Sequence, residues 1–397
     1  MSRQDFLQEL ALYLNKLPQT DFDEVMAYFT ELFDEAGIDG EAELMVSLGS
    51  PQEAAADILD QLLEDSVGAK KKTSSAPPTP LTKERKSQDK QRNHVEKNLP
   101  AFDQLDLALS ELDVLIVPSL DETFSISYFK TRADHPLPFS YEVVDDCLRV
   151  YSLEHQTHQE NRISLWGNWN SRNTALSTLV IKVPAGIVFT KAAVSLGCGD
   201  LILNKISLTS IHVQVGSGDI ELDQIVTQQG ELSTGSGDIS LKECQLHQTT
   251  FNTGSGDIEL DNCRLERSKL NTGSGDLELT QTLVEHSQLA TASGDVDLVQ
   301  GSLNSSQITI VSGDVSLSNP SYAGTITVTT QSGDIECKGL SEQLSQINLT
   351  ANTSFGEIDG KRLKNIQTVR DNYAEHMVPN AKAILLLQSQ SGDIDLS

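Results

Sequence analysis

The stretch NTGSGDIEL, residues 252–260, is followed by NTGSGDLEL, residues 271–279. The Gly-Asp pair within this stretch recurs along the chain, at a step of nineteen residues at first and at wider steps later: Gly199, Gly218, Gly237, Gly256, Gly275, Gly294, Gly313, Gly333, Gly356 and Gly392. After Gly356 the acidic residue is Glu357 instead of Asp. Self-similarity at a fixed period is typical of repeat architectures.

The apolar residues of each unit alternate with polar ones. In the unit that follows Gly256, the residue after Asp is Ile258 and the next apolar residue is Leu260. Two further alternating pairs lie around residues 263–265 and 270–272. Because spacing by two is the period of a β-strand, each unit predicts three short strands. One such coil buries too little apolar surface to fold alone, so the units must stack. We therefore predict a mainly β chain that contains a single-stranded parallel β-solenoid with 19-residue coils.

The less regular segments on either side of the repeats predict the ends of this solenoid. LDVLIVPS, residues 112–119, resembles a degenerate unit, with Asp113, Val114 and Ile116 in the Asp and core positions. Residues 99–198 are predicted to form an irregular β cap and the first coils, and residues 199–397 the regular solenoid with a C-terminal cap. We expect residues 357–391 to fold over the far end, because an open edge strand recruits other chains.

Residues 1–65 predict a small α-helical bundle. Ser2 and Asp5 form a capping box for the first helix, and a second helix is expected from about Thr20 to Ala36. Two short helices hinged at Gly49 complete this domain.

Residues 66–98 predict a basic, disordered linker, because they are rich in Pro, Ser and charge and poor in large apolar residues. They hold 9 basic residues against 3 acidic ones. Besides acting as a solvated tether, such a segment can make weak contact with an anionic membrane or dock on the acidic domains of its own chain.

The net charge of −28 restricts the partners of the folded parts. Residues 1–65 hold 16 acidic and 2 basic residues, and residues 99–397 hold 38 and 18. These parts would repel a phosphate backbone, so no nucleic-acid binding is expected through them. No window approaches the roughly 18 to 20 apolar residues of a transmembrane segment. The polar start MSRQD does not look like a signal peptide. These features predict a cytoplasmic or membrane-peripheral protein.

Stacking places one aspartate of each unit in a single column: Asp200, Asp219, Asp238, Asp257, Asp276, Asp295, Asp314 and Asp334. Carboxylates about 4.8 Å apart repel by about 1 kcal/mol in water. In a structural role, each carboxylate would accept backbone N–H groups of its own or the next turn, while the glycines beside the Ser adopt positive φ. The alternative is a Ca²⁺ ladder, since calcium is bound by roughly six to eight oxygens. The unit differs from the nine-residue repeat of glycine-rich calcium-binding proteins, so the pattern favours the structural role.

The sequence offers few other candidate sites. His155 and His158 are three residues apart but lack further ligands for a metal. Trp166 and Trp169 are expected to pack a cap, with sugar or partner stacking as the alternative. Solenoid enzymes need a cleft built by long loops, and the uniform steps leave no room for such loops. We therefore expect no catalytic residues and no cofactor.

The five cysteines lack C-x-x-C spacing and are odd in number, so neither a zinc site nor a disulfide framework is predicted. Cys244 and Cys263 are one period apart and should stack in the core. Cys198 replaces the Ser of the turn and is the thiol expected to be exposed.

The helical domain resembles the HAAS signalling domain of Gram-positive bacteria, through QDFLQEL, LPQTDFDEV and LGSPQEAAADIL. Members of that family usually precede membrane segments or extracytoplasmic modules and are often encoded beside PadR-type regulators. The resemblance implies a protein partner for this domain.

Residues 99–397 resemble the bacterial family named "putative adhesin", through DVLIVPS, VIKVPAGIVFTKAAVSLGCGDLIL and the run of GSGDIEL units. This resemblance implies a non-enzymatic β-solenoid, with links to cell-envelope stress and antimicrobial-peptide responses. We therefore expect an interaction or scaffold protein in envelope-stress signalling that binds protein partners through the helical domain or a solenoid face. The alternatives are a surface adhesin and a calcium-binding solenoid rod.

Overall fold

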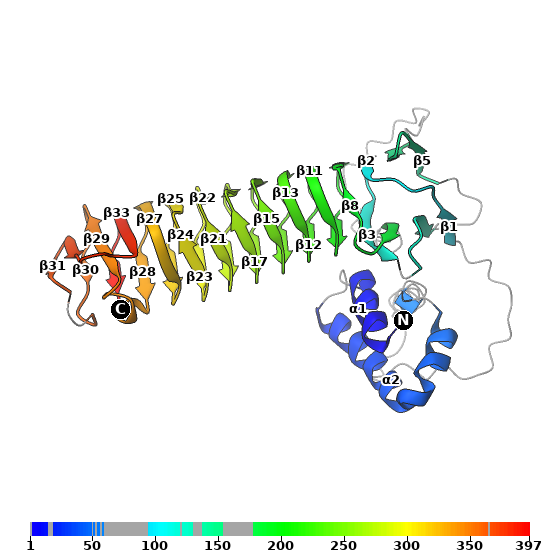
Figure 1. Cartoon of the computed structure of the whole chain (residues 1–397), viewed down its shortest axis with the longest axis horizontal. Helices are drawn as coiled ribbons and strands as arrows, with labels where there is room; N and C mark the ends of the chain where they lie inside the picture. Colours follow the sequence, from blue (N-terminus) through cyan, green and yellow to red (C-terminus); the bar gives the residue numbers. More distant parts are fainter. Residues whose placement is uncertain are drawn as a thin grey trace, which may run out of the picture. The chain divides into compact units, whose positions relative to one another are not determined.

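A computed structural model shows that the nineteen-residue unit folds as one coil of three strands (Figure 1). In one coil the strands are β17 (Ile258–Asp261), β18 (Arg264–Glu266) and β19 (Lys269–Thr272). Each strand pairs in parallel with the equivalent strand of the next coil, so that Ile258 lies opposite Leu277. The predicted parallel β-solenoid with 19-residue coils is therefore confirmed.

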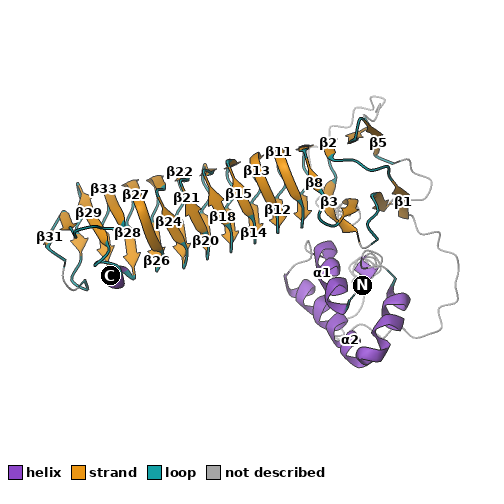
Figure 2. Cartoon of the chain, in the orientation of Figure 1, coloured by secondary structure: helices purple, strands orange, loops and turns teal. Residues whose placement is uncertain are grey.

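The structure describes residues 2–14, 19–49, 51, 54, 55, 58, 94–119, 121–129, 137–153, 178–363 and 366–397. Most of the predicted linker lies outside these residues, as do His155, His158, Trp166 and Trp169. The chain divides into two units: the first comprises Met1–His94, Phe129–His135 and Glu160–Ser177, and the larger one comprises Val95–Tyr128, Pro136–Gln159 and Thr178–Ser397. Figure 2 shows helices in the first and mainly strands in the second, which also has a short helix near the C-terminus.

One wall of the solenoid, which we call sheet A, contains the first strand of every coil. In spatial order its strands are β1 (His94–Asn98), β4 (Ser125–Phe129), β7 (Thr178–Pro184), β3 (Asp113–Ser119), β10 (Leu201–Asn204), β12 (Ile220–Asp223), β14 (Ile239–Lys242), β17, β20 (Leu277–Thr280), β23 (Val296–Val299), β26 (Val315–Ser318), β28 (Ile335–Lys338), β34 (Ile394–Leu396) and β30 (Ile358–Asp359).

The second and third strands of the coils form the other walls. The second strands are β8 (Val188–Phe189), β15 (Gln245–His247), β18, β21 (Leu283–Glu285) and β24 (Ser302–Asn304). The third strands are β2 (Gln104–Leu109), β5 (Phe139–Val144), β6 (Cys147–Ser152), β9 (Lys191–Leu196), β16 (Thr249–Thr253), β19, β22 (Gln288–Thr291), β25 (Gln307–Ser312), β29 (Ile347–Thr353), β31 (Thr368–Arg370), β32 (Tyr373–His376) and β33 (Ala383–Ser391). Three longer strands run through both walls: β11 (Ser207–Val215), β13 (Val226–Thr234) and β27 (Ser321–Ser332).

A single hydrophobic core runs the length of the solenoid between these walls. Each coil contributes inward side chains at the period of two that the sequence predicts, such as Ile258, Leu260 and Leu270, all at most 2% exposed. Because equivalent residues stack on one another, the core consists of columns of similar side chains. Burial of each such side chain stabilises the fold by roughly 1.5 to 3 kcal/mol.

At the N-terminal end of the solenoid, the spatial order of the coils differs from their order in the sequence. Strand β3 lies between β7 and β10, and Val114 is opposite both Leu179 and Leu201. Strand β2 likewise lies between β6 and β9. The segment 104–119 is thus inserted between coils that follow it in the sequence. Asp113 occupies the Asp position of this coil, which confirms the degenerate unit.

The C-terminal end has a matching insertion. Strand β33 lies between β27 and β29, and Leu387 is opposite both Val328 and Ala351. The expectation that residues 357–391 fold over the far end is therefore wrong for β33, which is an internal strand. The physical reason is that β33 and β34 together form a complete unit. The backbone N–H and C=O groups of this unit pair with β27 and β28 on one side and with β29 and β30 on the other. Near this end the short helix η2 (Leu340–Glu342) follows β28.

Antiparallel strands cover both ends of the parallel stack. At the N-terminal end β4 pairs with β7 and β5 with β6. At the C-terminal end β32 pairs with β29 and with β31. A reversal of strand direction interrupts the repeating edge that would otherwise accept another chain.

The first unit is built from two described helices, α1 (Arg3–Leu14) and α2 (Gln19–Leu48). The predicted capping box is confirmed, because Ser2 N donates to Asp5 Oδ2 and Asp5 N donates to Ser2 Oγ. Helix α2 is broken at Gly37 (φ 63°), directly after the predicted end at Ala36. No helix of the described residues is long and apolar enough to cross a membrane.

Candidate functional site

A ladder of carboxylate hydrogen bonds runs along sheet A. Asp238 Oδ1 accepts the backbone N–H of Asp257 at 2.8 Å, and Asp257 Oδ1 accepts that of Asp276 at 2.8 Å. The same bond, at 2.7 to 3.0 Å, joins each acidic residue to the next in spatial order: Asp113, Asp200, Asp219, Asp238, Asp257, Asp276, Asp295, Asp314, Asp334, Asp393 and Glu357. We call these residues the ladder row.

The ladder row satisfies backbone donors at the corner where each coil enters sheet A. Directly after the corner, Ile258 N donates to the carbonyl of Asp276, which begins the ordinary parallel ladder. The N–H of Asp257 itself is satisfied by a side chain of the neighbouring coil. This geometry confirms the structural role predicted for the aspartates, since a buried or half-buried N–H without an acceptor is costly.

A threonine supplies the second side-chain bond of the corner. Thr253 Oγ1 donates to the carbonyl of Gly237 at 2.9 Å and accepts the N–H of Gly256 at 3.0 Å. Equivalent bonds are made by Thr234 and Thr272. Ser255, two residues further along the chain, lies exposed at the corner. The buried position of Thr253 follows from its spacing of two from Phe251.

The corner glycines are required for close approach between coils. A Cβ on Gly256 would overlap the carbonyl oxygen of Gly237. The expected positive φ is wrong for Gly254 and Gly256, although it occurs at Gly313 (φ 149°) and Gly333 (φ 154°). Left-handed corners are instead formed by non-glycine residues elsewhere in the coil, such as Gln281 (φ 50°).

A second row of acidic side chains lies beside the ladder row on the outer surface of sheet A. It consists of residues two positions after the ladder aspartates, in register on neighbouring strands: Glu221, Glu259, Glu278, Asp297, Glu336, Asp395 and Asp359, with Ser240 and Ser316 between them. The alternation of apolar and polar residues in each unit predicts that Glu259 faces outward, but the row itself was not predicted. The signal was the recurring Asp-x-Glu or Asp-x-Asp spacing, which puts both carboxylates on one face of a strand.

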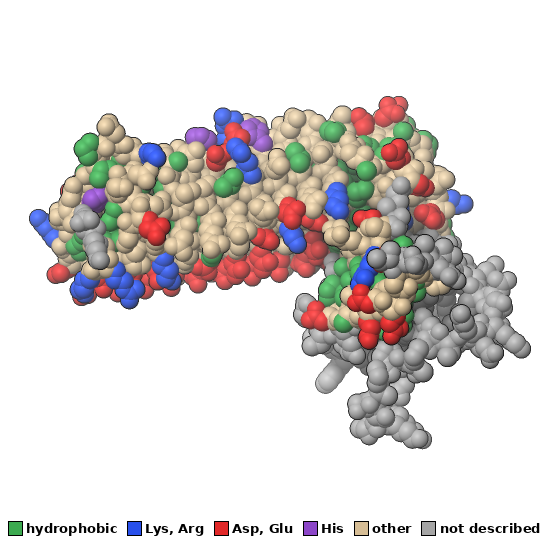
Figure 3. Space-filling model, turned by 60° about the horizontal axis from the view of Figure 1, so that its bottom comes forward, with side chains coloured by type: hydrophobic (Ala, Val, Ile, Leu, Met, Phe, Trp, Pro, Cys, Tyr) green, Lys and Arg blue, Asp and Glu red, His purple; other side chains and the backbone are tan. Residues whose placement is uncertain are grey.

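The charges of the two rows act on each other. Partial burial among neighbouring side chains raises the pKa of Glu259, and the charges of Glu278, Asp238 and Asp257 raise it further. Figure 3 shows Asp and Glu side chains as a continuous strip along the solenoid. We call the ladder row and the second row together the acidic face.

In the ladder row, Oδ1 of each accepting carboxylate is occupied by a backbone N–H of the neighbouring coil, so a calcium ladder would have to use the second carboxylate oxygen. Among the residues that the structure describes, no three His, Cys, Asp or Glu side chains are grouped so as to hold a metal ion. The calcium alternative stays a prediction that titration tests.

Two protein-family models match this chain, one for each of its two parts. A model described as Toastrack DUF4097 matches residues 102–266 and 231–397, which together exceed half of the chain. The chain belongs to the Toastrack DUF4097 family. A HAAS model matches residues 5–57, so the resemblance of the helical domain is also confirmed.

Three solved structures are similar to this chain. One is described as a "putative cell adhesion protein" from Clostridium sporogenes (13% identity, 77% of this chain and 98% of that chain, TM-score 0.24). A second is a "putative lipid binding protein" from Parabacteroides distasonis (14%, 77% and 96%, TM-score 0.40). A third is a "putative adhesin" from Bacteroides fragilis (13%, 76% and 95%, TM-score 0.32). A comparison with curated proteins gave no match.

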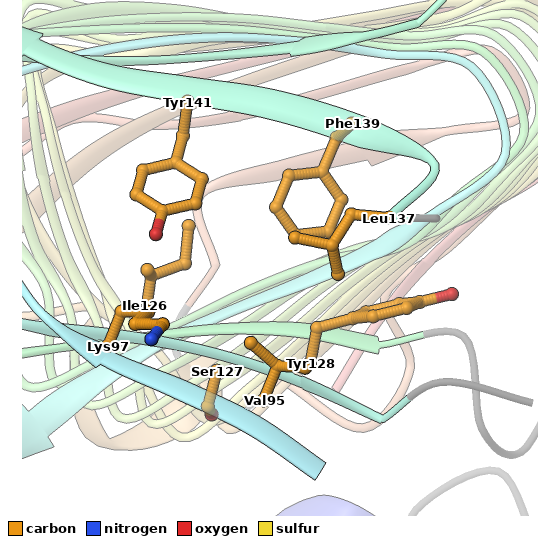
Figure 4. Close-up of a pocket in the computed structure, with 8 residues that line it drawn as sticks. All are labelled: Val95, Lys97, Ile126, Ser127, Tyr128, Leu137, Phe139 and Tyr141. Atoms are coloured by element: carbon orange, nitrogen blue, oxygen red, sulfur yellow. The ribbon is translucent and has the colours of Figure 1, made fainter. Parts of the chain in front are cut away.

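The Toastrack domain has a small apolar pocket at its N-terminal end. Figure 4 shows Phe139 and Tyr141 of β5 facing Ile126 and Tyr128 of β4. The cavity volume is about 10 Å³, enough for roughly one water molecule. This pocket is therefore a packing feature of the end.

A wider hollow of about 380 Å³ lies over β2, β6 and β9. It is lined by Asp106 and Asp145 and also by Arg149 and Lys191, whose charges balance. Burial raises the pKa of Cys147 in this hollow, and the charge of Asp106 raises it further. The thiol is therefore kept in its unreactive protonated form.

The other cysteines of the Toastrack domain lie where the repeat predicts. Cys244 and Cys263 stack in the core, and Cys244 N lies 3.4 Å from Cys263 Sγ. Burial raises the pKa of Cys337 to about 12. Cys198 is exposed, as predicted.

Proposed function

We propose that this protein is a non-enzymatic interaction scaffold whose acidic face binds a cationic partner, such as an extended Lys- or Arg-rich peptide segment. The observation that supports this proposal is the pair of in-register carboxylate rows along sheet A. Ser240 and Ser316 are the non-acidic positions within the second row between Glu221 and Asp359, so no basic side chain interrupts it. A cationic ligand would offset the charges of Glu278, Asp238 and Asp257, which add to the effect of burial in raising the pKa of Glu259.

The spacing of the coils suggests how such a segment would bind. Coils that pair as parallel strands are about 4.8 Å apart, and a peptide in the polyproline II conformation rises about 3.1 Å per residue with about three residues per turn, so that every third side chain lies on one side. Three residues of peptide therefore span about two coils. A peptide that lies along the solenoid with a basic residue at every third position would face a carboxylate of the second row at each second coil.

The remaining parts of the proposal concern the cellular role. The HAAS domain would bind a protein partner, and the two modules together would act in bacterial cell-envelope stress signalling. We propose a cytoplasmic or membrane-peripheral location. Protease treatment of intact cells tests this location, because cleavage within residues 66–98 from outside would favour a surface adhesin instead.

Calorimetric titration with a synthetic peptide tests the binding proposal. The probe is a fifteen-residue Gly/Ser peptide with Lys at every third position. The test variant E259Q/E278Q/D297N removes three charges of the acidic face, and E231Q/E266Q/E285Q removes three from the other walls. We expect the first variant to bind about tenfold more weakly, a loss of about 1.4 kcal/mol, and the second to bind like the wild type.

Salt dependence provides a second reading of the same titration. Binding should weaken as NaCl rises from 50 to 500 mM, because exposed charges are screened at that ionic strength. Equal binding by the two triple variants, or no binding by the wild type at 50 mM NaCl, would show that the acidic face is not the binding surface.

A further inference from the structure

The outer corner of the last coil carries a residue that differs in kind from all its equivalents. In the other coils the residue before the Gly-Asp pair is small and exposed: Cys198, Ser217, Ser236, Ser255, Ser274, Ser293, Ser312, Ser332 and Ser391. In the last coil it is Phe355, whose residue is 81% exposed. Since a small polar residue serves this corner in every other coil, packing does not require an aromatic side chain there.

Basic side chains lie on the same coil and on the strands that cover it. Lys361, Arg362 and Arg370 are exposed, and residues 361–370 contain no acidic residue. Figure 3 shows Lys and Arg side chains gathered at this end of the solenoid. This end therefore places basic side chains beside Glu357 and Asp359, the last carboxylates of the acidic face.

Contacts between the last coil and the antiparallel strands that cover it hold these residues at this end. Ile358 N donates to the carbonyl of Asp371 at 2.8 Å, so the end of β31 is tied to β30. Val369 is 40% exposed and lies over Gly360. An aromatic residue, an aliphatic residue and three basic residues are thus held at one end of the Toastrack domain.

We propose that this C-terminal tip, made of Phe355, Lys361, Arg362, Val369 and Arg370, docks on an anionic lipid bilayer. Apolar side chains that enter the headgroup region, together with basic side chains at the phosphates, are the usual composition of an interfacial anchor. Asp359 pairs with Lys361 at 3.6 Å and weakens the electrostatic part, so the aromatic side chain carries much of the binding.

The shape and charge of the domain favour a bilayer over other anionic partners. The apolar side chains of the tip are exposed, Phe355 at 81% and Val369 at 40%, as entry into a headgroup region requires. A nucleic-acid duplex presents phosphates but no apolar layer that Phe355 and Val369 could enter, and its phosphates would be repelled by the neighbouring acidic face. Docking through the tip places only the end of the solenoid at the membrane, so the acidic face extends away from it. The proposal is independent of what the acidic face binds.

Co-sedimentation of the full chain with lipid vesicles tests the proposal. The vesicles contain equal parts of phosphatidylcholine and phosphatidylglycerol, and phosphatidylcholine vesicles serve as the neutral comparison. The parent protein carries K70Q/K71Q/K72Q, which weakens any contribution of the basic linker. F355S restores the residue found at the other corners, and K361Q/R362Q/R370Q removes the basic side chains. L283S and K269Q are the matched controls, because Leu283 is a 42% exposed hydrophobic residue outside the tip and Lys269 an exposed base.

We expect the parent protein to sediment with the anionic vesicles and not with the neutral ones. F355S and the triple tip variant should each reduce the bound fraction at least fivefold, while L283S and K269Q bind like the parent. Failure of the parent to sediment, or parent-like binding by F355S, overturns the proposal. So does a parent dimer that F355S converts to a monomer, because the tip would then be a contact between two copies.

Discussion

Asp238 Oδ1 and the backbone nitrogen of Asp257 are 2.8 Å apart, although a whole coil separates the two residues in the sequence. Each ladder aspartate between Asp113 and Glu357 thus accepts a hydrogen bond from one neighbouring coil and donates its own N–H to the other. The ladder row therefore affects stability in two ways, through its hydrogen bonds and through the repulsion between its negative charges. A substitution that keeps the hydrogen-bond acceptor but removes the charge separates these two contributions.

The first prediction separates them at Asp257. Asp257→Ala should lower the free energy of unfolding by about 1 to 3 kcal/mol, because the N–H of Asp276 loses its acceptor. Asp257→Asn keeps an oxygen at this position and removes one of the repelling charges, so it should equal or exceed the wild type in stability. Urea denaturation followed by circular dichroism measures both. If the two variants were equally destabilised, the charge rather than the hydrogen bond would matter.

The second prediction concerns the close approach at Gly256. Gly256→Ala should lower the free energy of unfolding by about 3 kcal/mol or more, because the new methyl group would overlap the carbonyl oxygen of Gly237. Ser255→Ala is the control at the adjacent exposed corner and should change stability by less than about 0.5 kcal/mol. Thermal melting compares the two, and a wild-type melting temperature for Gly256→Ala would contradict the packing of the coils.

The third prediction follows from the raised pKa of Glu259. A carboxyl group with a higher pKa in the folded state stabilises the fold while protonated. This contribution is complete below the unfolded pKa of about 4.3 and is lost as pH rises through the folded value. Glu259→Gln should therefore raise the melting temperature at pH 7 but not at pH 4. A melting temperature that is lower than the wild type at pH 7 would show that the Glu259 charge is compensated.

The fourth prediction tests the calcium alternative. Because the ladder carboxylates accept backbone N–H groups, we expect 2 mM CaCl₂ and 2 mM MgCl₂ to shift the melting temperature equally, by charge screening. A rise that is specific to calcium and disappears in Asp257→Asn would support a bound ion.

The fifth prediction concerns the inserted C-terminal strand. Truncation after Lys382 removes β33 and β34 and leaves β27, β28, β29 and β30 without a partner on one side. Limited proteolysis should then degrade residues 340–382 and stop at the regular coils. Within the strand, Leu387→Ala should cost about 2 to 5 kcal/mol, because Leu387 is 1% exposed. Ile384→Ala, at 41% exposure, is the matched control and should be mild.

The regular coils could be predicted from the sequence because their stabilising contacts lie one period apart. Ile258 contacts residues nineteen positions away on either side, so a fixed repeat determines both the strand and its partners. The ladder row was predictable for the same reason. The buried role of Thr253 was also within reach, since its spacing from Phe251 places it on the inner face.

The ends of the solenoid could not be predicted in the same way. Asp113 accepts a hydrogen bond from Asp200 across 87 residues, and Asp393 donates to Asp334 across 59. The local sequence pattern identifies both segments as repeat units, but it does not predict between which coils of the stack each segment lies. The conformation of the corner glycines was also predicted wrongly. The sequence shows that these positions lack a Cβ, but it does not show whether a positive φ or a close approach between coils requires glycine there.

The two insertions limit how the solenoid can grow. Segment 104–119 and strand β33 each lie between coils that are separate from them in the sequence, so neither end can be extended by adding another unit. Between these ends, the coils from β12 to β26 follow one another in sequence. Duplication or loss of one 19-residue unit there would lengthen or shorten the domain without altering either terminus. The length of this protein is therefore open to evolutionary adjustment in its middle only, in steps of one coil.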